Sequence, residues 1–250
     1  MTGIFITARL GSTRLIEKHL IEAGGKPFIN WLVDRFLFEF IEEIAQNKVK
    51  IFIATSIDAK NKRFENYFKD SQVGIFYGSD ENIPLRHLQC AEANDIKNIV
   101  SIDGDDILCS TQAARLVMDK LISGAKMAQT TGLPFGMNAF GYNVDFLKKS
   151  LRKKKYKTLE TGWGKIFDKN QSVNIEFKND DNVSQIRMTL DYEDDAIFFK
   201  NVIENIGDKI VQMSDKLLIE SIIKNNWDRF NNSLDEIYWQ NFNKQKQKEE

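Results

Sequence analysis

The 250-residue sequence is poor in cysteine, proline and histidine, with two, three and two of these residues. Cys90 and Cys109 lie far apart in the chain and show no metal-binding spacing. This pattern argues against a disulfide scaffold and against a cysteine-based zinc site. A chain without paired cysteines fits a reducing compartment, so we expect a cytoplasmic protein.

Long apolar runs and an excess of charge of one sign are also missing. No apolar stretch reaches the roughly 18 residues that span a bilayer, and the N-terminus lacks the features of a signal peptide. The 35 basic residues are balanced by 36 acidic ones, so no overall positive field attracts a nucleic-acid backbone. We therefore expect no membrane span and no nucleic-acid partner, although a local basic pocket remains compatible with this composition.

Short apolar runs alternate with helical patterns through the first half of the chain. Strands are expected at Gly3–Ala8, Val49–Ala54, Val73–Tyr77, Asn98–Ile102 and Ala125–Thr131. Helices are expected between them at Phe28–Ala45, Lys60–Lys69, Ile83–Asn94 and Thr111–Ile122. This alternation predicts an α/β fold with a doubly wound, mainly parallel sheet that helices cover on both faces.

The alternation becomes irregular between residues 132 and 182, where one further strand is expected at Ser172–Phe177. We interpret 132–182 as a small inserted lid or dimerisation subdomain. The core then consists of residues 1–131 and 183–212, and residues 213–250 form a C-terminal helical tail. Within the core, a strand is expected at Val183–Leu190.

A basic loop follows the first expected strand and contains Ala8-Arg9-Leu10-Gly11-Ser12-Thr13-Arg14-Leu15, with Lys18 shortly after. Ligands bind at the carboxyl ends of strands in doubly wound sheets. Gly11 allows the backbone to approach a ligand closely, while Arg9, Arg14 and Lys18 supply positive charge that suits phosphate. The alternative is a surface loop with solvated basic side chains, and the loop alone does not decide between the two.

Carboxylates follow two other expected strands. Asp103-Gly104-Asp105-Asp106 comes after the fourth strand, and Asp191 is expected at the end of Val183–Leu190. Carboxylate oxygens are ligands that Mg²⁺ prefers. The alternative for the first segment is an acidic turn that closes a strand. The acidic residues after Asp191 are expected to favour the N-terminus of the next helix.

The segment Gly78-Ser79-Asp80 is open to two interpretations. Its resemblance to a G-(S/T)-(D/E) motif of a nucleotide-binding family implies contact with a nucleotide, whereas the residues themselves fit a turn that caps the following helix. His87 is expected on the face of that helix, and His19 in a loop without a catalytic role.

Taken together, these segments resemble the signature motifs of the CMP-sugar synthetase group of cytidylyltransferases. The basic loop is similar to A-R-x-G-S-x-R-(L/F)-P-G-K, the first acidic segment to G-D-x-P, and the segment around Asp191 to L-T-V-D-T-P-E-D. The group includes CMP-Kdo and CMP-sialate synthetases and the spore-coat polysaccharide cytidylyltransferases, which the chain resembles most. The resemblance spans residues 3–200. The chain departs from it at Ile16-Glu17, where the group has Pro-Gly, and at Ile107, where it has Pro.

The resemblance implies a Rossmann-like nucleotidyltransferase fold, CTP as substrate, Mg²⁺ as cofactor and a homodimer. The acceptor would be an acidic sugar or a related phosphorylated small molecule, activated with release of pyrophosphate for bacterial surface glycan synthesis. Catalysis is assigned to Arg9, Arg14, Lys18, Asp105 and Asp191, of which Asp105 and Asp191 bind the metal. Nucleotide binding is assigned to Ala8, Arg9, Gly11, Ser12, Thr13, Arg14, Lys18, Gly78, Ser79, Asp103 and Gly104. Acceptor binding is assigned to Arg86, Asn138, Trp163 and Arg187.

Two alternatives to this function stay open. The first is a nucleotidyltransferase that uses another nucleotide, or a polyol phosphate, phosphonate or other acceptor. The second is a catalytically silent protein that binds a sugar nucleotide, which the losses of Pro-Gly at Ile16-Glu17 and of Pro at Ile107 would allow.

Overall fold

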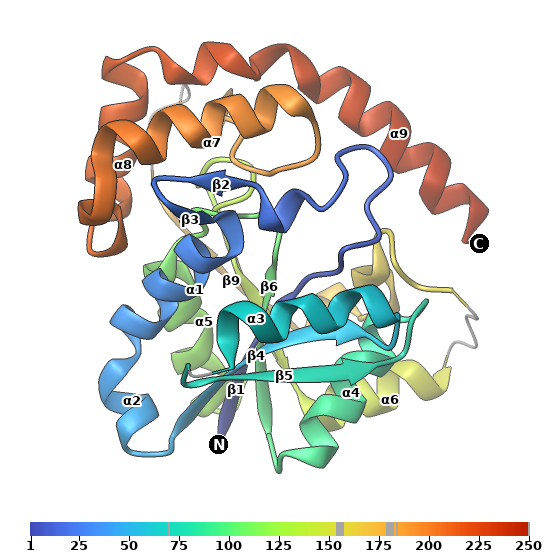
Figure 1. The fold of residues 1–250 in the computed structure, drawn as a ribbon. Coiled ribbons are helices and arrows are strands. Elements are labelled where there is room, and N and C mark those ends of the chain that lie inside the picture. Colours follow the sequence, from blue (N-terminus) through green and yellow to red (C-terminus); the bar gives the residue numbers. More distant parts are fainter. Residues whose placement is uncertain (70, 154–157, 179–182, 184, 250) are drawn as a thin grey trace.

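A seven-stranded sheet forms the centre of the protein in a computed structural model, which describes residues 1–69, 71–153, 158–178, 183 and 185–249 (Figure 1). The strand order is β5-β4-β1-β6-β8-β7-β9. The strands are β1 (Thr2–Thr7), β4 (Val49–Ser56), β5 (Val73–Gly78), β6 (Asn98–Asp103), β7 (Met127–Thr131), β8 (Phe140–Asn143) and β9 (Ser172–Glu176). Strand β8 is antiparallel to both neighbours, and the other pairings are parallel. The predicted α/β fold with a mainly parallel sheet is confirmed.

The chain changes direction across the sheet next to β1. From β1 it proceeds to β4 and β5 on one side, and then crosses back to β6 on the other side of β1. Such a switch point leaves a crevice at the carboxyl ends of the two strands between which it falls, and ligands of doubly wound sheets bind there. The topology therefore points to the ends of β1 and β6 as the place for a site.

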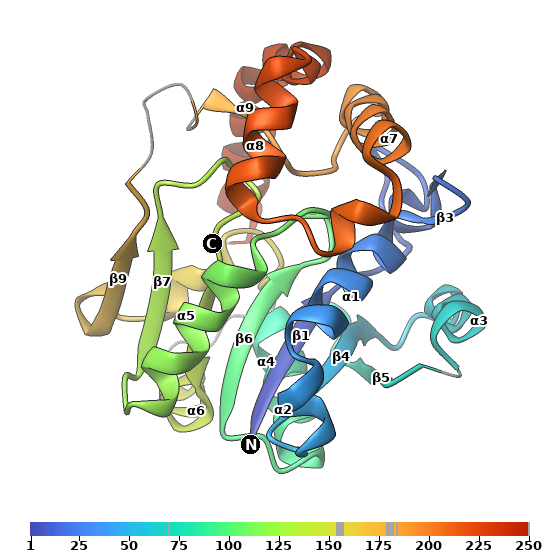
Figure 2. The same ribbon diagram turned by 90° about the vertical axis from the view of Figure 1, so that its left-hand side faces the viewer.

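Helices cover both faces of the sheet, as predicted. Helices α1 (Phe28–Glu39) and α5 (Thr111–Ile122) pack on one face, and α4 (Ile83–Ala93) and α6 (Val144–Lys153) on the other. Figure 2 shows α5 in front of the sheet, with α4 and α6 behind it. Short elements on this part of the chain include α2 (Ile41–Ala45), α3 (Glu65–Phe68), the 3₁₀ helices η1 (Lys18–Leu20) and η2 (Ala59–Phe64), and a two-stranded ribbon of β2 (Glu22–Ala23) and β3 (Lys26–Pro27).

Alternating side chains of the central strand enter two separate hydrophobic cores. Ile4 and Ile6 belong to the core on the α1 and α5 side, and Phe5 belongs to the core on the α4 and α6 side. All three side chains are fully buried. A strand buried on both faces is apolar throughout, which is why the first apolar run of the sequence predicted β1 correctly.

The sequence pattern indicates a subdomain separate from the core at residues 132–182, and the described part of this segment differs from that in its strands. The strand predicted at Ser172–Phe177 is present as β9, but β8 and β9 extend the same sheet that β1 and β6 form. The described part of this segment therefore adds strands to the core sheet and does not form a sheet of its own. A role as a lid or dimer contact stays a prediction.

The strand predicted at Val183–Leu190 is wrong for the residues of this range that the structure describes. Arg187 makes an isolated parallel bridge with Phe135, and no regular ladder forms. The apolar side chains Ile186, Met188 and Leu190 are buried in the core, so their alternation reflects burial without a neighbouring strand. Asp191 consequently follows an irregular, buried segment.

Three helices follow this segment: α7 (Glu193–Ile206), α8 (Asp215–Lys224) and α9 (Asp235–Lys248). They lie together beyond the carboxyl ends of β1 and β6 in both views (Figures 1 and 2). The short 3₁₀ turns η7 (Trp227–Phe230) and η8 (Asn232–Leu234) connect α8 to α9. The predicted helical tail is thus present and lies over the candidate ligand-binding edge. None of the helices in the described ranges has the length and apolar character that a membrane crossing requires.

Gly136 is a position where the fold requires glycine. Its φ is +93°, and a Cβ atom there would approach the carbonyl oxygen of Met188 to 2.2 Å. We expect Gly136→Ala to lower the free energy of unfolding by at least about 2 kcal/mol, because the backbone is strained and must also move. Urea unfolding measures this change. Gly164→Ala is the control, since no atom lies within 4 Å of the added methyl group; equal stabilities of the two variants would contradict the prediction.

Candidate active site

The basic loop and the first acidic segment start side by side. Thr7 at the end of β1 pairs with Asp103 at the end of β6, and the Gly104 amide donates to the Thr7 carbonyl oxygen at 2.8 Å. A Cβ atom at Gly104 would lie 2.8 Å from both Ala8 Cβ and that oxygen, so glycine is required for this close approach. The predicted meeting of these segments at one sheet edge is confirmed.

The Lys18 ammonium joins three distant parts of the chain. It lies 2.7 Å from Asp105 Oδ2 and 3.0 Å from Asp191 Oδ1. The guanidinium of Arg14 donates to the same Asp191 oxygen at 2.6 Å. Lys18 is only 6% exposed, whereas Arg14 is open to solvent. The structure therefore brings together four of the five residues that the sequence assigned to catalysis.

Charge compensation keeps this buried cluster ionised. Burial disfavours the charge on Lys18, yet Asp105 and Asp191 outweigh burial and raise the pKa of the ammonium. Burial also opposes ionisation of Asp105, but Lys18 and His19 hold the pKa of this carboxyl well below its usual range. Lys18 and Asp105 are consequently both charged at neutral pH.

His19 belongs to this cluster, although the sequence placed it in a loop without a role. Its side chain is buried, and its Nε2 atom lies 2.9 Å from Asp105 Oδ1. The adjacency of His19 to Lys18 was the available signal, but a histidine in a loop is too common for its burial to be predicted.

Arg9, the fifth residue assigned to catalysis, lies apart from the Lys18 cluster. Its guanidinium forms an ion pair with Glu160, whose side chain is largely buried. Arg9 thus links the basic loop to the segment that precedes Trp163. The sequence did not indicate this pairing, because nothing in the spacing of two residues so far apart reveals it.

The exposed part of the basic loop lies between a hydrogen-bonded residue, Leu10, and a residue with a left-handed backbone, Glu17. Gly11 and Thr13 are exposed and Ser12 is half-buried. Before them, the Leu10 amide donates to Asn61 Oδ1 at 2.8 Å. After them, Glu17 adopts a left-handed conformation with φ of +51°, which glycine favours.

Both departures from the family motif are accommodated. Glu17 occupies the position of the family's glycine, and its carboxylate forms an ion pair with Arg63. The extra negative charge is therefore neutralised from outside the cluster. Ile107, in place of proline, is fully buried in the larger core.

Gly78 ends β5 at the same sheet edge and Ser79 follows it. The neighbouring Arg86 has a structural role. Arg86 is 1% exposed and donates to the carbonyl oxygens of Ser79 and Asp80 at 2.8 and 2.9 Å. Asn82, whose side chain accepts from the Leu85 amide, is the N-cap of α4. Arg86 thus supports the backbone of this loop from the protein interior. Its burial does not support the predicted contact with an acceptor.

The other residues assigned to the acceptor are also engaged with the protein. Trp163 is buried in an aromatic cluster with Tyr142 and Phe167. Asn138 is half-buried and donates to the carbonyl oxygen of Leu133 at 3.1 Å. Burial of Trp163 does not support direct contact, so its assignment and that of Asn138 stay predictions.

Arg187 is a further buried residue among those assigned to the acceptor. It is 1% exposed, and its guanidinium donates to Asp195 from Nε at 2.9 Å and from Nη2 at 3.2 Å. Its Nη2 atom lies 3.5 Å from Asp191 Oδ2. Arg187 therefore lies between the carboxylates of Asp191 and Asp195, and its burial does not support the predicted contact with an acceptor.

Asp105 and Asp191 fit a magnesium ion by the chemistry and convergence of their oxygens. Both carboxylates contact one ammonium group, so they face a common point. Mg²⁺ is usually held by one or two carboxylates, with water and phosphate oxygens completing its shell. Within the described ranges, no group of three or more His, Cys, Asp or Glu side chains is placed to hold a metal. The pair would thus hold Mg²⁺ together with a nucleotide.

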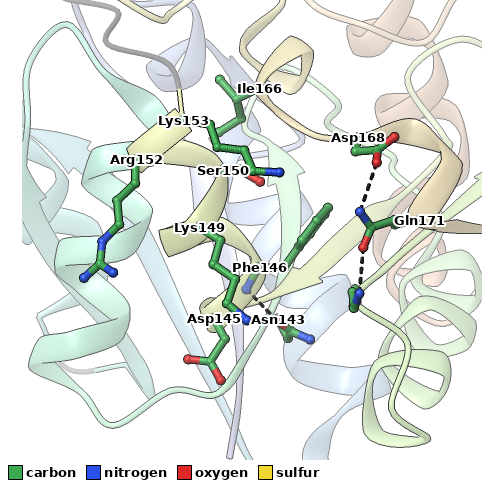
Figure 3. A pocket seen from close by; sticks show the side chains of 11 residues that line it. Asn143, Asp145, Phe146, Lys149, Ser150, Arg152, Lys153, Ile166, Asp168 and Gln171 are labelled. Carbon is green, nitrogen blue, oxygen red and sulfur yellow. Dashed lines mark hydrogen bonds between the residues drawn. The ribbon is translucent and has the colours of Figure 1, made fainter.

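A cavity of about 530 Å³ lies at the opposite end of the sheet from this cluster (Figure 3). Asn143, one of its lining residues, pairs with Asn98 at the start of β6. Figure 3 shows Phe146 of α6 between that helix and the segment of Asp168 and Gln171, which are hydrogen-bonded to each other. Its lining comprises Lys126, Asn143, Asp145, Phe146, Lys149, Ser150, Arg152, Lys153, Ile166, Asp168 and Gln171. The cavity therefore has no part in the candidate active site.

A doubly wound sheet with a basic loop after β1 and a pair of carboxylates facing that loop defines a nucleotidyltransferase. A family model described as cytidylyltransferase matches residues 4–193. The chain belongs to the cytidylyltransferase family. This confirms the resemblance that the sequence motifs indicated.

Solved structures support the same fold. A cytidylyltransferase from Leptospira borgpetersenii serovar Hardjo-bovis has a TM-score of 0.77 at 23% identity, covering 91% of this chain and 95% of that chain. A CMP:2-keto-3-deoxy-manno-octonic acid synthetase complexed with CTP has a TM-score of 0.58 at 12% identity, with 82% and 98% covered. A 4-diphosphocytidyl-2C-methyl-D-erythritol synthase from Anaerococcus prevotii has a TM-score of 0.53 at 13% identity, with 81% and 96% covered. No curated protein matches the chain.

Lys18 should be the largest electrostatic contributor to the stability of this edge. We expect Lys18→Met to lower the free energy of unfolding by about 3 kcal/mol at neutral pH, because it removes the buried cation that lies between Asp105 and Asp191 and balances their negative charges. The folded-state pKa of Asp105 is depressed, so its pairing stabilises the protein above its unfolded pKa, about 3.9, and the stabilisation is lost as pH falls. The deficit of the variant should therefore shrink in acid.

Urea unfolding at neutral pH and at about pH 3 measures this deficit. Lys216→Met is the matched control, because Lys216 pairs with Glu220 on the exposed surface of α8. A Lys18→Met deficit that is independent of pH would contradict the charge-compensation argument.

Proposed function

We propose that the protein transfers CMP from CTP to an acidic sugar or a related phosphorylated small molecule, with Mg²⁺ and with release of pyrophosphate. The observation that carries this proposal is the cluster of Arg14, Lys18, Asp105 and Asp191 at the switch point of the sheet. Membership of the cytidylyltransferase family supports transfer of a cytidylyl group. A role in bacterial surface glycan synthesis, a homodimer and a cytoplasmic location are parts of the same proposal that rest on the sequence resemblance.

The basic loop would hold the triphosphate of the nucleotide. Arg9 and Arg14 are partly exposed at the sheet edge, where Glu160 and Asp191 hold their guanidinium groups in place. From these positions the guanidinium groups can reach phosphate oxygens. The exposed backbone of Gly11 to Thr13 adds amide donors at the end of β1. An acceptor oxygen attacks the α-phosphorus, the bond from that phosphorus to the bridging oxygen breaks, and pyrophosphate leaves.

The carboxylates of Asp105 and Asp191 would hold the metal. Bound Mg²⁺ neutralises the charge that develops on the phosphate oxygens. Asp105 and Asp191 supply its protein oxygens, and Lys18 compensates their charge from the buried side. Since the protein contributes positioning and charge stabilisation, the reaction requires no nucleophilic side chain.

A catalytically silent binding protein is less consistent with this arrangement. That alternative depended on the departures at Ile16-Glu17 and Ile107. Glu17 pairs with Arg63 and Ile107 is buried in the core, so neither disturbs the Lys18 cluster. A polyol phosphate or phosphonate acceptor is compatible with the same cluster.

The carboxylates should be essential for turnover. We expect Asp105→Asn and Asp191→Asn each to lower kcat at least about 100-fold, because each removes an oxygen ligand of the metal at the reacting phosphate. Pyrophosphate release with CTP, Mg²⁺ and a panel of acidic sugars and sugar phosphates measures the effect. Asp194→Asn is the matched control, since Asp194 is exposed on α7. Near-normal turnover in either variant would refute the assignment of metal ligands.

CTP should stabilise the protein more than ATP, GTP or UTP. Cytosine is small enough for backbone groups near Gly11 and Gly78 to contact its amine and carbonyl groups. A site built around the amine rejects uracil, because buried donors and acceptors would be left unpaired. Thermal-shift titration of the four nucleotides with Mg²⁺ tests this preference, since a ligand that binds only the folded state raises its stability. A larger rise of the melting temperature with another nucleotide would refute cytidylyl transfer. The proposal of nucleotidyl transfer would then still stand.

A further inference from the structure

The segment that carries Asp191 has few backbone partners. On the sheet side, the amides of Met188 and Leu190 donate to the carbonyl oxygens of Phe135 and Asp105, at 2.7 and 2.9 Å. Beyond Leu190 this backbone support ends. The position of Asp191 must therefore be determined by side chains around it.

A buried carboxylate, Asp195, provides this support. Its Oδ2 atom accepts from the backbone amides of Asp191 at 2.9 Å and Tyr192 at 3.0 Å. The Asp195 side chain is fully buried, and Arg187 donates to both of its oxygens. Asp195 thus holds the turn of backbone from which the Asp191 carboxylate extends toward Lys18.

Asp195 and Arg187 are in turn held by residues that follow α8. Asn231, which is fully buried, donates from Nδ2 to Asp195 Oδ1 at 2.8 Å and to the Arg187 carbonyl oxygen at 3.1 Å. Asp235 Oδ1 lies 3.4 Å from Arg187 Nη1. The ring centroid of Tyr238 lies 4.6 Å from Arg187 Cζ. Three residues from one short stretch of chain therefore converge on the group that supports Asp191.

We propose that the chain from Asn231 to the first turn of α9 belongs to the active site and that Asn231 is a positioning residue for Asp191. Asn231 acts through Asp195: its amide fixes the carboxylate that holds the backbone of Asp191 and Tyr192. Asp235 has the same role to a smaller extent, through Arg187. The match to the cytidylyltransferase family ends at residue 193, so these positioning groups come from outside the matched region. The effect of Asn231 on catalysis rests on the proposed function of Asp191, whereas its effect on the position of Asp191 does not.

Amide hydrogen exchange tests the positioning directly. In Asn231→Ala, exchange at the amides of Asp191 and Tyr192 should be about tenfold faster, because their acceptor Asp195 loses a charge-assisted hydrogen bond. Exchange in β1 and β6 should not change. Asn232→Ala is the matched control, since Asn232 is the adjacent asparagine and is exposed.

Metal binding supplies the second measurement. With CTP present, the dissociation constant for Mn²⁺, followed by the electron paramagnetic resonance signal of the free ion, should rise about threefold to tenfold in Asn231→Ala. The Asn232→Ala protein should bind Mn²⁺ like the unmodified chain.

The outcomes distinguish the positioning role of Asn231 from the proposed metal site. Unchanged exchange at Asp191 and Tyr192, or a uniform increase that includes β1 and β6, would overturn the positioning role of Asn231. No Mn²⁺ binding by the unmodified chain with CTP would count against the proposed metal site, while the exchange result would still decide the positioning.

A second substitution guards against a variant that does not fold. Asp235→Asn preserves side-chain volume at a partly exposed position, and we expect it to increase exchange at the same two amides by a smaller factor. Glu236→Gln on the next, exposed residue is its control. Equal exchange in these two variants would contradict support from the C-terminal segment.

Discussion

The active-site edge depends on one buried positive charge, the ammonium of Lys18 between Asp105 and Asp191. A buried charge is unfavourable unless it is paired, and the buried Asp191 and the half-buried Asp105 would repel each other without the ammonium between them. The contact therefore stabilises the approach of three segments that are remote in sequence. It also makes the two carboxylates converge on one point, the ammonium nitrogen of Lys18.

The surrounding fold positions the residues of this contact in two ways. Parallel pairing of β1 and β6 aligns the starts of the basic loop and of the Asp105 segment, so their approach follows from the sheet. The Asp191 segment has no strand ladder, and its position depends on buried polar contacts instead. Asp195 and Asn231 provide those contacts from α7 and from the chain before α9. One half of the site is thus held by secondary structure, and the other half by side-chain hydrogen bonds.

Residue type and position relative to the strands indicated that Arg14, Lys18, Asp105 and Asp191 share one edge of the sheet, because the carboxyl ends of parallel strands meet there. Their roles in binding and catalysis rest on the resemblance to the family motifs and stay predictions. The reasoning from strand ends also placed Asp191 at the end of a regular strand, which does not form. Alternating apolar residues bury equally well in an irregular segment, so the pattern of residues 183–190 could not distinguish the two. His19 was not predicted as part of the cluster, because its contact with Asp105 depends on the path of the loop.

The sequence by itself determined the α/β fold class, the burial of the central strands and the sign of the charge at each strand end. These properties depend on local hydrophobic periodicity and on the residues that follow each strand. Only the tertiary structure decided that Arg86 and Arg187 support backbone and carboxylates from inside the protein. It also decided that Asn231 reaches Asp195. Burial and hydrogen bonding between residues far apart in the chain depend on how helices pack over the sheet, which no local pattern encodes.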